Sequence, residues 1–168
     1  MTLSETEAFL GQLTAQREHI LGAIEGLDDA ALRRPVLPSG WNCVGLVSHL
    51  AADVERFWFG AVVAGDDGII RQVTEGHKEH EDAWQVSPGI AVEAVMREYQ
   101  QQIELANAII SSTPLEAPPA WWPDFFGDWR LETLREILLH VLAETATHAG
   151  HLDAVRELID GHTWVILT

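Results

Sequence analysis

The chain has 168 residues, of which 26 are acidic and 10 are basic, so its formal net charge at pH 7 is −16. This charge argues against binding to nucleic acid backbones or anionic membranes, because both use surfaces rich in lysine and arginine. The single cysteine, Cys43, excludes an intramolecular disulfide and a cysteine-based structural zinc site. No apolar stretch approaches the roughly 20 residues of a membrane span, and the acidic amino terminus does not resemble a signal peptide. We therefore expect one cytoplasmic domain over residues 1–168.

The amino-terminal half predicts two long helices from the spacing of its apolar residues. The first covers about 3–25 and opens with a capping box that begins at Ser4. A short turn is expected around 28–33, and the second long helix covers about 42–64. Residues 65–89 are polar and acidic, with four glycines and a proline, and predict a long connection.

The carboxyl-terminal half predicts two more long helices. One covers about 90–112, and a loop rich in proline and tryptophan follows over 113–130. The last helix covers about 131–160, with a capping box that begins at Thr133 and a helix stop at Gly161.

Evidence for strands is limited to residues 164–167, which look extended, and the sequence has no internal repeat. The prediction is therefore an all-α protein, a four-helix bundle with long connections between helices. Sites in such bundles are built from side chains on facing helices.

The last predicted helix carries the residues with the clearest chemistry. At about 100° per residue, His148 falls within the apolar stripe, and Glu144 lies one turn earlier on its flank. A carboxylate and an imidazole at this spacing can bind one metal ion from a single helix. The apolar stripe consists of Leu134, Leu138, Val141, Thr145, Leu152, Val155 and Ile159.

A third ligand is expected from a facing helix, and the second predicted helix offers His49 at the edge of its apolar face. Two histidines and one carboxylate with vacant positions form a donor set typical of catalytic zinc. Nickel or ferrous iron also accepts this set, so the spacing does not name the metal, although zinc is the first expectation.

Each of these residues also has an ordinary interpretation. His148 is compatible with a hydrogen-bonded histidine in the core, and Glu144 with a surface partner of His140 or His148. His49 is compatible with a solvated side chain beside Asp53, one turn later. The residues alone leave both interpretations open.

Three stretches resemble the signature of the DinB-like superfamily. They read Gly40-Trp41-x-x-x-x-Leu46-Val-x-His49-Leu, Leu134-Arg-x-x-Leu-Leu-His140 and Glu144-x-x-x-His148-Ala-Gly-His151-x-Asp-x-x-Arg156. Within the superfamily the chain is most similar to the branch that includes the amino-terminal domain of mycothiol-dependent maleylpyruvate isomerase. In most of the superfamily the position of Glu144 is a histidine, whereas in that branch it is a glutamate, as here.

The resemblance implies a four-helix bundle, often dimeric, in which His49, Glu144 and His148 bind one divalent metal ion. It also implies chemistry with a low-molecular-weight thiol such as mycothiol and a small electrophile as partners. The isomerase has a second, carboxyl-terminal domain that this sequence lacks, so the resemblance leaves isomerisation of maleylpyruvate itself open. The leading hypothesis is a metal-dependent thiol S-transferase or a thiol-dependent isomerase.

Further residues are candidates around this centre. Asp53 and His151 are candidates for orienting ligands or handling protons, and His140 for orienting Glu144. The loop before the last helix contains an aromatic cluster that would cover a substrate pocket or pack over the end of the bundle. Its members are Trp121, Trp122, Phe125, Phe126 and Trp129, and the tryptophans are the candidate substrate-binding residues.

The alternative function is a non-enzymatic, metal-binding module that dimerises in a stress response.

Two other features are expected to carry no chemistry. Cys43 lies at the start of a helix, where a thiolate is favoured, but a lone cysteine more often packs as a small apolar residue. The pair His77 and His80 falls in the polar connection and is expected to be solvated.

Overall fold

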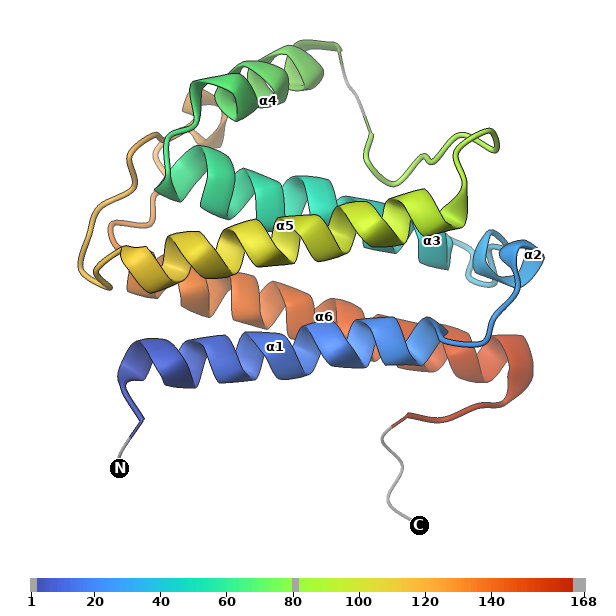
Figure 1. The fold of residues 1–168 in the computed structure, drawn as a ribbon. Helices are drawn as coiled ribbons and strands as arrows, with labels where there is room; N and C mark the ends of the chain where they lie inside the picture. The colour runs from blue at the N-terminus through green and yellow to red at the C-terminus, as the bar shows by residue number, and fades with distance from the viewer. Residues whose placement is uncertain (1–2, 80–81, 165–168) are drawn as a thin grey trace.

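The computed structural model describes residues 3–79 and 82–164 and is helical throughout its regular parts. Four long helical rods lie roughly parallel or antiparallel to one another (Figure 1). One rod changes character along its length, because the α-helical turns of α3 continue without a break into π-helical turns in η1. The rods are α1 (Glu5–Ile24), α3 (Cys43–His49) with η1 (Leu50–Val63), α5 (Val92–Ser112) and α6 (Leu134–Asp160). The predicted all-α fold is confirmed.

Short helices occupy the connections between the rods. The expected turn after α1 is α2 (Asp29–Leu32). A single 3₁₀ turn, η2 (Asp124–Phe126), lies in the loop over residues 113–130 that contains the aromatic cluster, here called the aromatic loop. The extended segment predicted near the carboxyl terminus falls mostly on residues 165–168, which lie outside the described residues.

The connection over residues 65–89 needs a correction, since it contains a helix of thirteen residues, α4 (Asp67–Glu79). Asp66 caps its start by accepting a hydrogen bond from the backbone N–H of Ile69 at 2.9 Å. The side chain of Ile69 packs directly over Gly60 of η1, where a larger residue would collide with it. Figure 1 shows α4 lying across one end of this rod. The helix was not predicted because the segment is mostly polar and acidic. It is an amphipathic helix that packs on the bundle through one apolar edge.

The predicted helix ends agree with the structure. At Ser4 both halves of the capping box form, since its hydroxyl accepts from Glu7 N and its own N–H donates to the Glu7 carboxylate. The Thr133 hydroxyl caps the start of α6 by accepting a hydrogen bond from the backbone N–H of Glu136. Gly161 ends α6 with a φ of 78°, a left-handed conformation that glycine adopts without a steric penalty.

The rods pack in two pairs, with α1 along α6 and α5 along η1. Their facing sides bury a continuous apolar core. Within it, the Arg17 guanidinium donates two hydrogen bonds to the Glu55 carboxylate, at 2.7 and 2.6 Å, and a third to Asn107 at 2.9 Å. This buried network joins α1, η1 and α5, and its geometry satisfies charges that would otherwise be costly to bury.

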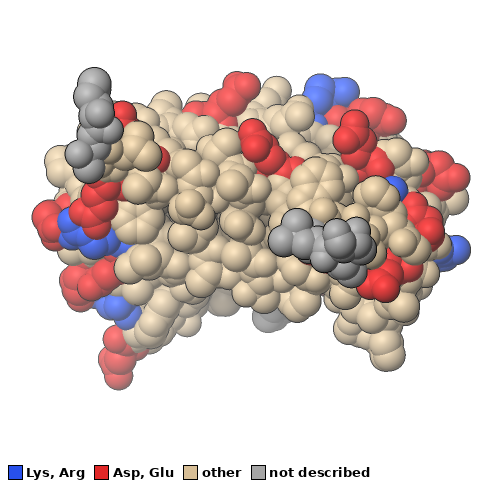
Figure 2. Space-filling view, turned by 90° about the horizontal axis from the view of Figure 1, so that it is seen from below, with Lys and Arg blue, Asp and Glu red and all other residues tan. Residues whose placement is uncertain are grey.

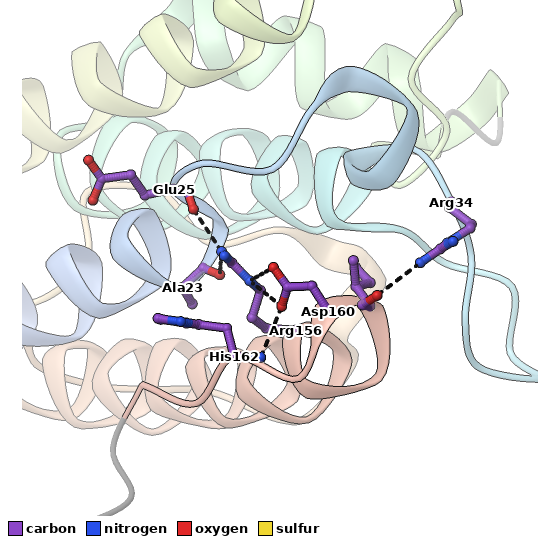
Figure 3. A network of polar contacts seen from close by, with 7 residues as sticks. Ala23, Glu25, Arg34, Arg156, Asp160 and His162 are labelled. Carbon is purple, nitrogen blue, oxygen red and sulfur yellow. Dashed lines mark hydrogen bonds and ion pairs between the residues drawn. The ribbon is translucent and has the colours of Figure 1, made fainter.

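Polar contacts also join α1 to α6. Arg156 donates to the backbone carbonyls of Ala23 and Glu25, both at 2.8 Å, and to the Asp160 carboxylate at 3.0 Å (Figure 3). These carbonyls lie at the end of α1, where no later turn of helix supplies a donor. On the same side, the His19 ring lies 2.7 Å from the Asp153 carboxylate. Asp153 and Arg156, two positions of the family signature, therefore act in holding helices together.

The surface is predominantly acidic. Seen from the side on which α1 and α6 lie, acidic side chains gather toward the margins and an uncharged area occupies the middle (Figure 2). Among the described residues, no helix has the length and apolar character that crossing a membrane requires.

Candidate metal centre and adjoining cavity

His49 lies at the point where α3 passes into the π-helical turns of η1. Local π-helical geometry is frequent at functional sites, because the altered register re-aims side chains. The ring of His49 is mostly buried, with 13% of its side chain exposed. Its Nδ1 lies 2.9 Å from Asp53 Oδ2, one turn later on the same rod.

Glu144 and His148 lie one turn apart on α6 and face His49 across the bundle. His49 Nε2 is 3.6 Å from Glu144 Oε1, and the rings of His49 and His148 are 5.1 Å apart. Each of the three residues offers one ligand atom such that all three atoms lie within 4.8 Å of one another. The structure thus brings together the three residues that the sequence indicated.

The donor set fits a divalent ion on one further observation. His148 Nδ1 is buried and has no hydrogen-bond partner among the described residues. A buried imidazole nitrogen without a partner is unusual, and a bound ion would complete the polar contacts of this ring. Two imidazoles and a carboxylate suit zinc, nickel or ferrous iron.

In two of the three residues, burial and neighbouring charges shift the pKa toward the protonation state that a metal ligand needs. Burial would raise the pKa of Glu144, but the His49 ring and neighbouring histidines outweigh it, and the pKa is lowered. Burial, together with the positive charge of His49, lowers the pKa of His148 to about 4. Glu144 is therefore ionised and His148 neutral at pH 7, as ligands must be.

His49 behaves differently before metal binding. Burial lowers its pKa, but the hydrogen bonds to Asp53 and Glu144 outweigh burial and raise the pKa to about 9. In the metal-free protein at pH 7 this ring is protonated. It must lose that proton when it becomes a ligand.

The centre opens into a cavity of about 910 Å³ whose wall includes His49 and Glu144. A smaller hollow of about 310 Å³ adjoins the same carboxylate and is lined by His148 as well. The large cavity lies between η1, α4, α6 and the aromatic loop. Its lining is formed by Ser48, His49, Ala52, Asp53, Arg56, Phe57, Trp58, Gln72, Val73, Gly76, His77, Asp82, Ala83, Gln85, Phe125, Phe126, Trp129, His140 and Glu144.

A sequence model described as Mycothiol-S-transferase matches residues 8–161 of the chain. The chain belongs to the mycothiol S-transferase family. This family is DinB-like, so the superfamily predicted from the sequence is confirmed. Searches of the curated proteins and of the solved structures found no match. The matched region includes all three residues of the candidate metal centre.

In this member of the mycothiol S-transferase family, the other predicted site residues lie at different distances from the centre. Asp53 contacts His49 directly, and His140 Nε2 lies 3.5 Å from Glu144 Oε2. His151 is exposed, with its ring 5.5 Å from that of His148. Asp53 and His140 thus touch a candidate ligand, while His151 stands beside one.

The three tryptophans predicted to bind substrate differ in whether they line the cavity. Trp129 lines the cavity. Trp122 donates a hydrogen bond from its indole to the backbone carbonyl of Trp129 at 3.1 Å and packs on Trp58, whereas Trp121 packs on Phe57. Trp121 and Trp122 therefore contact lining residues without lining the cavity themselves.

Of the two features expected to carry no chemistry, Cys43 is placed as predicted, whereas the expectation of a solvated loop residue is wrong for His77, which lies on a helix and lines the cavity. Cys43 is 1% exposed, and burial raises the pKa of its thiol to about 11. His77 lies on α4 and stacks on Phe125 at 4.2 Å between ring centroids, while His80 lies outside the described residues.

Sequence reasoning missed the contribution of the 65–89 segment and of Arg56. Trp84 stacks on His49 with ring centroids 4.5 Å apart and also contacts His148 at 5.5 Å. Gln72 and Val73 on α4 line the cavity. The apolar pattern Ile69, Ile70 and Val73 after a capping aspartate would have indicated α4, but no sequence pattern pointed to the stacking of Trp84.

Proposed function

We propose that this protein is a divalent-metal-dependent enzyme that transfers a low-molecular-weight thiol, mycothiol or a close relative, onto a small electrophile. The observation that carries the proposal is the position of the candidate metal centre in the wall of a large cavity. The membership of the mycothiol S-transferase family supports the thiol. A cavity of this size beside the centre favours an enzyme over a module that only binds metal.

The roles of the residues follow from their contacts. His49, Glu144 and His148 would hold the ion, with zinc the first candidate and nickel or ferrous iron the alternatives. A bound divalent ion would lower the pKa of a thiol beside it and so supply a thiolate near neutral pH. Asp53 orients the His49 ring through Nδ1, and a carboxylate in this position also makes the ring a stronger ligand.

The remaining groups act on the substrates. His140 lies beside the outer oxygen of Glu144 and is placed to fix that carboxylate. The aromatic side chains that line the cavity, here called the aromatic wall, are Phe57, Trp58, Phe125, Phe126 and Trp129. They would bury the apolar part of an electrophile and exclude water from the reacting atoms. His151, exposed next to His148, is placed to exchange protons with solvent.

The test combines metal analysis with a transfer assay. We expect about one zinc, nickel or iron per chain of tag-free protein, and metal-dependent conjugation of mycothiol to 1-chloro-2,4-dinitrobenzene followed by absorbance. His148→Ala is expected to lose both. The matched control is His162→Ala, which removes an exposed histidine beyond α6 and should keep both.

Two outcomes would contradict this function. One is a folded wild-type protein that takes up no metal on reconstitution. The other is a metal-loaded protein that conjugates no thiol to any electrophile in a panel of halides, epoxides and enones. The second outcome would leave the non-enzymatic module as the better hypothesis.

We also propose that the enzyme is a cytoplasmic homodimer that pairs through α6. The exposed side of this helix carries no charge over four turns, at Leu139, Ala143, Ala146, Gly150 and Ala154. In a chain of net charge −16, two copies approach with least repulsion where a surface is uncharged. Sedimentation equilibrium should show a dimer that Ala146→Glu dissociates, while Gln101→Glu on the exposed side of α5 should leave it intact.

A further inference from the structure

Arg56 is the only lysine or arginine among the described residues that line the cavity. It lies on η1, seven residues after His49 along the same rod. Its side chain is half-buried. The cavity therefore has a candidate metal centre at one end of this stretch and one fixed positive charge at the other.

The guanidinium of Arg56 has no hydrogen bond and no ion pair within the described part of the chain. Its Nε is fully shielded from solvent and is among the few buried polar atoms without a partner. A buried donor on a charged group is costly to leave unpaired. This arginine is thus free to bind a group that the described residues do not supply.

The other half-buried and buried arginines show what that group is. In this chain each of them donates to a carboxylate. Arg17 pairs with Glu55, Arg33 with Asp29, Arg135 with Glu5 and Glu116, and Arg156 with Asp160. Among the half-buried and buried arginines of the described residues, only Arg56 lacks this partner, although its guanidinium has the same planar fork that matches a carboxylate.

The carboxylates already in the cavity wall are engaged elsewhere. Asp53 faces His49, Glu144 belongs to the candidate metal centre, and Asp82 accepts from the backbone N–H of Trp84 at 2.9 Å. Their negative charges disfavour an anion at other points of the wall. An incoming carboxylate is therefore directed to Arg56.

We propose that Arg56 is the carboxylate-binding residue of the cavity, and that the electrophile taken by the enzyme carries a carboxylate several bonds from its reacting carbon. This proposal rests on the thiol-transfer function proposed above. With Arg56 holding the carboxylate, the aromatic wall covers the body of the electrophile and its reacting carbon lies toward His49 and Glu144. Arg56 would then set both the specificity and the orientation of the acceptor.

The test compares two acceptors that differ in this one group, 4-chloro-3-nitrobenzoate and 4-chloro-3-nitrobenzamide. In both, the thiolate sulfur bonds to the ring carbon that carries chlorine, the carbon–chlorine bond breaks, and chloride leaves with the electron pair. The proton of the thiol goes to solvent. Rates are expressed relative to the uncatalysed reaction of each acceptor, because the amide activates the ring more than the carboxylate does.

We expect the wild type to prefer the benzoate in kcat/KM, and Arg56→Met to lose about 10- to 100-fold with the benzoate, mainly through KM. The same variant should keep its rate with the benzamide, and Arg56→Lys should recover part of the preference. Arg71→Met, an exposed arginine of α4 outside the cavity lining, is the matched control and should change neither rate.

A binding measurement separates this proposal from the transfer function. Trp58 and Trp129 line the cavity, so titration with 4-chloro-3-nitrobenzoate should quench tryptophan fluorescence in the wild type and much less in Arg56→Met. Arg56-dependent binding without transfer to any acceptor would overturn the transfer function and leave this site standing. Equal loss with both acceptors, a change in the KM of the thiol alone, or no change at all would overturn the carboxylate site.

Discussion

His49 and Asp53 lie one turn apart on the same rod, and the 2.9 Å contact between Nδ1 of the ring and Oδ2 of the carboxylate fixes the face that His49 presents to α6. The contact leaves Nε2 directed toward Glu144, 3.6 Å away. The carboxylate thereby determines which nitrogen is available as a ligand.

The first prediction concerns this contact. Asp53→Asn keeps the shape of the side chain but removes the charge that orients and strengthens the imidazole as a ligand. Compared well above pH 9, where the His49 ring is deprotonated with or without Asp53, we expect metal affinity to fall about 10- to 100-fold, as is usual for loss of a carboxylate behind a ligating histidine. Competition with a chelating dye measures it, and Asp128→Asn in the exposed loop is the control. Unchanged affinity would mean that Asp53 has no part in the centre.

The second prediction is the release of a proton on metal binding. In the metal-free protein the pKa of His49 is raised to about 9, because the bonds to Asp53 and Glu144 outweigh burial. Below that pH the ring is charged and metal must displace its proton, so affinity should rise about tenfold per pH unit from 7 to 8.5. Titration calorimetry in two buffers of different ionisation enthalpy counts the protons.

The raised pKa of His49 affects fold stability and metal affinity in opposite directions. As the pH rises, the metal-free fold loses stability, whereas the affinity for metal increases. A raised pKa in the folded protein stabilises the metal-free fold fully below the pKa of about 6.5 expected in the unfolded chain. That stabilisation is lost as the pH rises through about 9. Asp53→Asn removes the main contact that raises the pKa, so it should reduce both the proton release and this pH dependence. Proton release equal to that of the wild type would contradict the assignment.

The sequence predicted the four rods and the candidate centre because both depend on local spacing. The apolar periodicity places α1, α5 and α6 within a few residues of their observed ends, and Glu144 and His148 share a face of one helix wherever that helix packs. Spacing offered His49, at the edge of the apolar face of a facing helix, as the third ligand, and the match to the family signature supported this choice.

The parts that escaped prediction depend on contacts between distant segments. Trp84 meets His49 only because the chain after α4 returns over α3, and Arg56 is distinguished from other arginines by lying in the cavity wall with a buried Nε that has no partner among the described residues. Neither property has a local signature. The helix α4 is an intermediate case, because its apolar pattern is present but is diluted by charged residues.

The third prediction tests the buried ion pair between Arg17 and Glu55. Glu55→Ala leaves a buried guanidinium with only Asn107 as its partner, and we expect a loss of about 3–5 kcal/mol in the free energy of unfolding. Urea unfolding followed by circular dichroism measures it. The double variant Arg17→Met with Glu55→Met removes both charges and should recover most of the stability. A double variant as unstable as the single one would show that the pair itself, and not the unpaired charge, stabilises the fold.

The fourth prediction concerns Cys43. Its thiol is 1% exposed, and burial raises its pKa to about 11, so almost no thiolate exists at pH 8. We expect no reaction with Ellman's reagent in the native protein and one thiol per chain in urea. Cys43→Ala should keep thiol transfer, since the cysteine packs in the core. Rapid labelling of the native protein, or loss of transfer in a folded Cys43→Ala variant, would instead favour a direct role.

The last prediction uses two glycines to test the support of the centre by Trp84. A Cβ at Gly45 on α3 would collide with the backbone carbonyl of Trp84, the residue that stacks on His49. Because backbone cannot move aside as a flexible side chain can, Gly45→Ala should displace the 82–89 segment and loosen that stacking. We expect lower stability and weaker metal binding, read by thermal unfolding and by the chelator competition.

Gly11→Ala on α1 is the matched control, because no atom lies within 4 Å of the Cβ it adds and Gly11 is not part of the α6 surface proposed for pairing. There the only change is the higher helix propensity of alanine, which should stabilise the protein by about 0.5–1 kcal/mol. The same substitution is therefore expected to act with opposite sign at two helical positions. If Gly45→Ala were as harmless as Gly11→Ala, the return of Trp84 over α3 would not be what holds His49 in place.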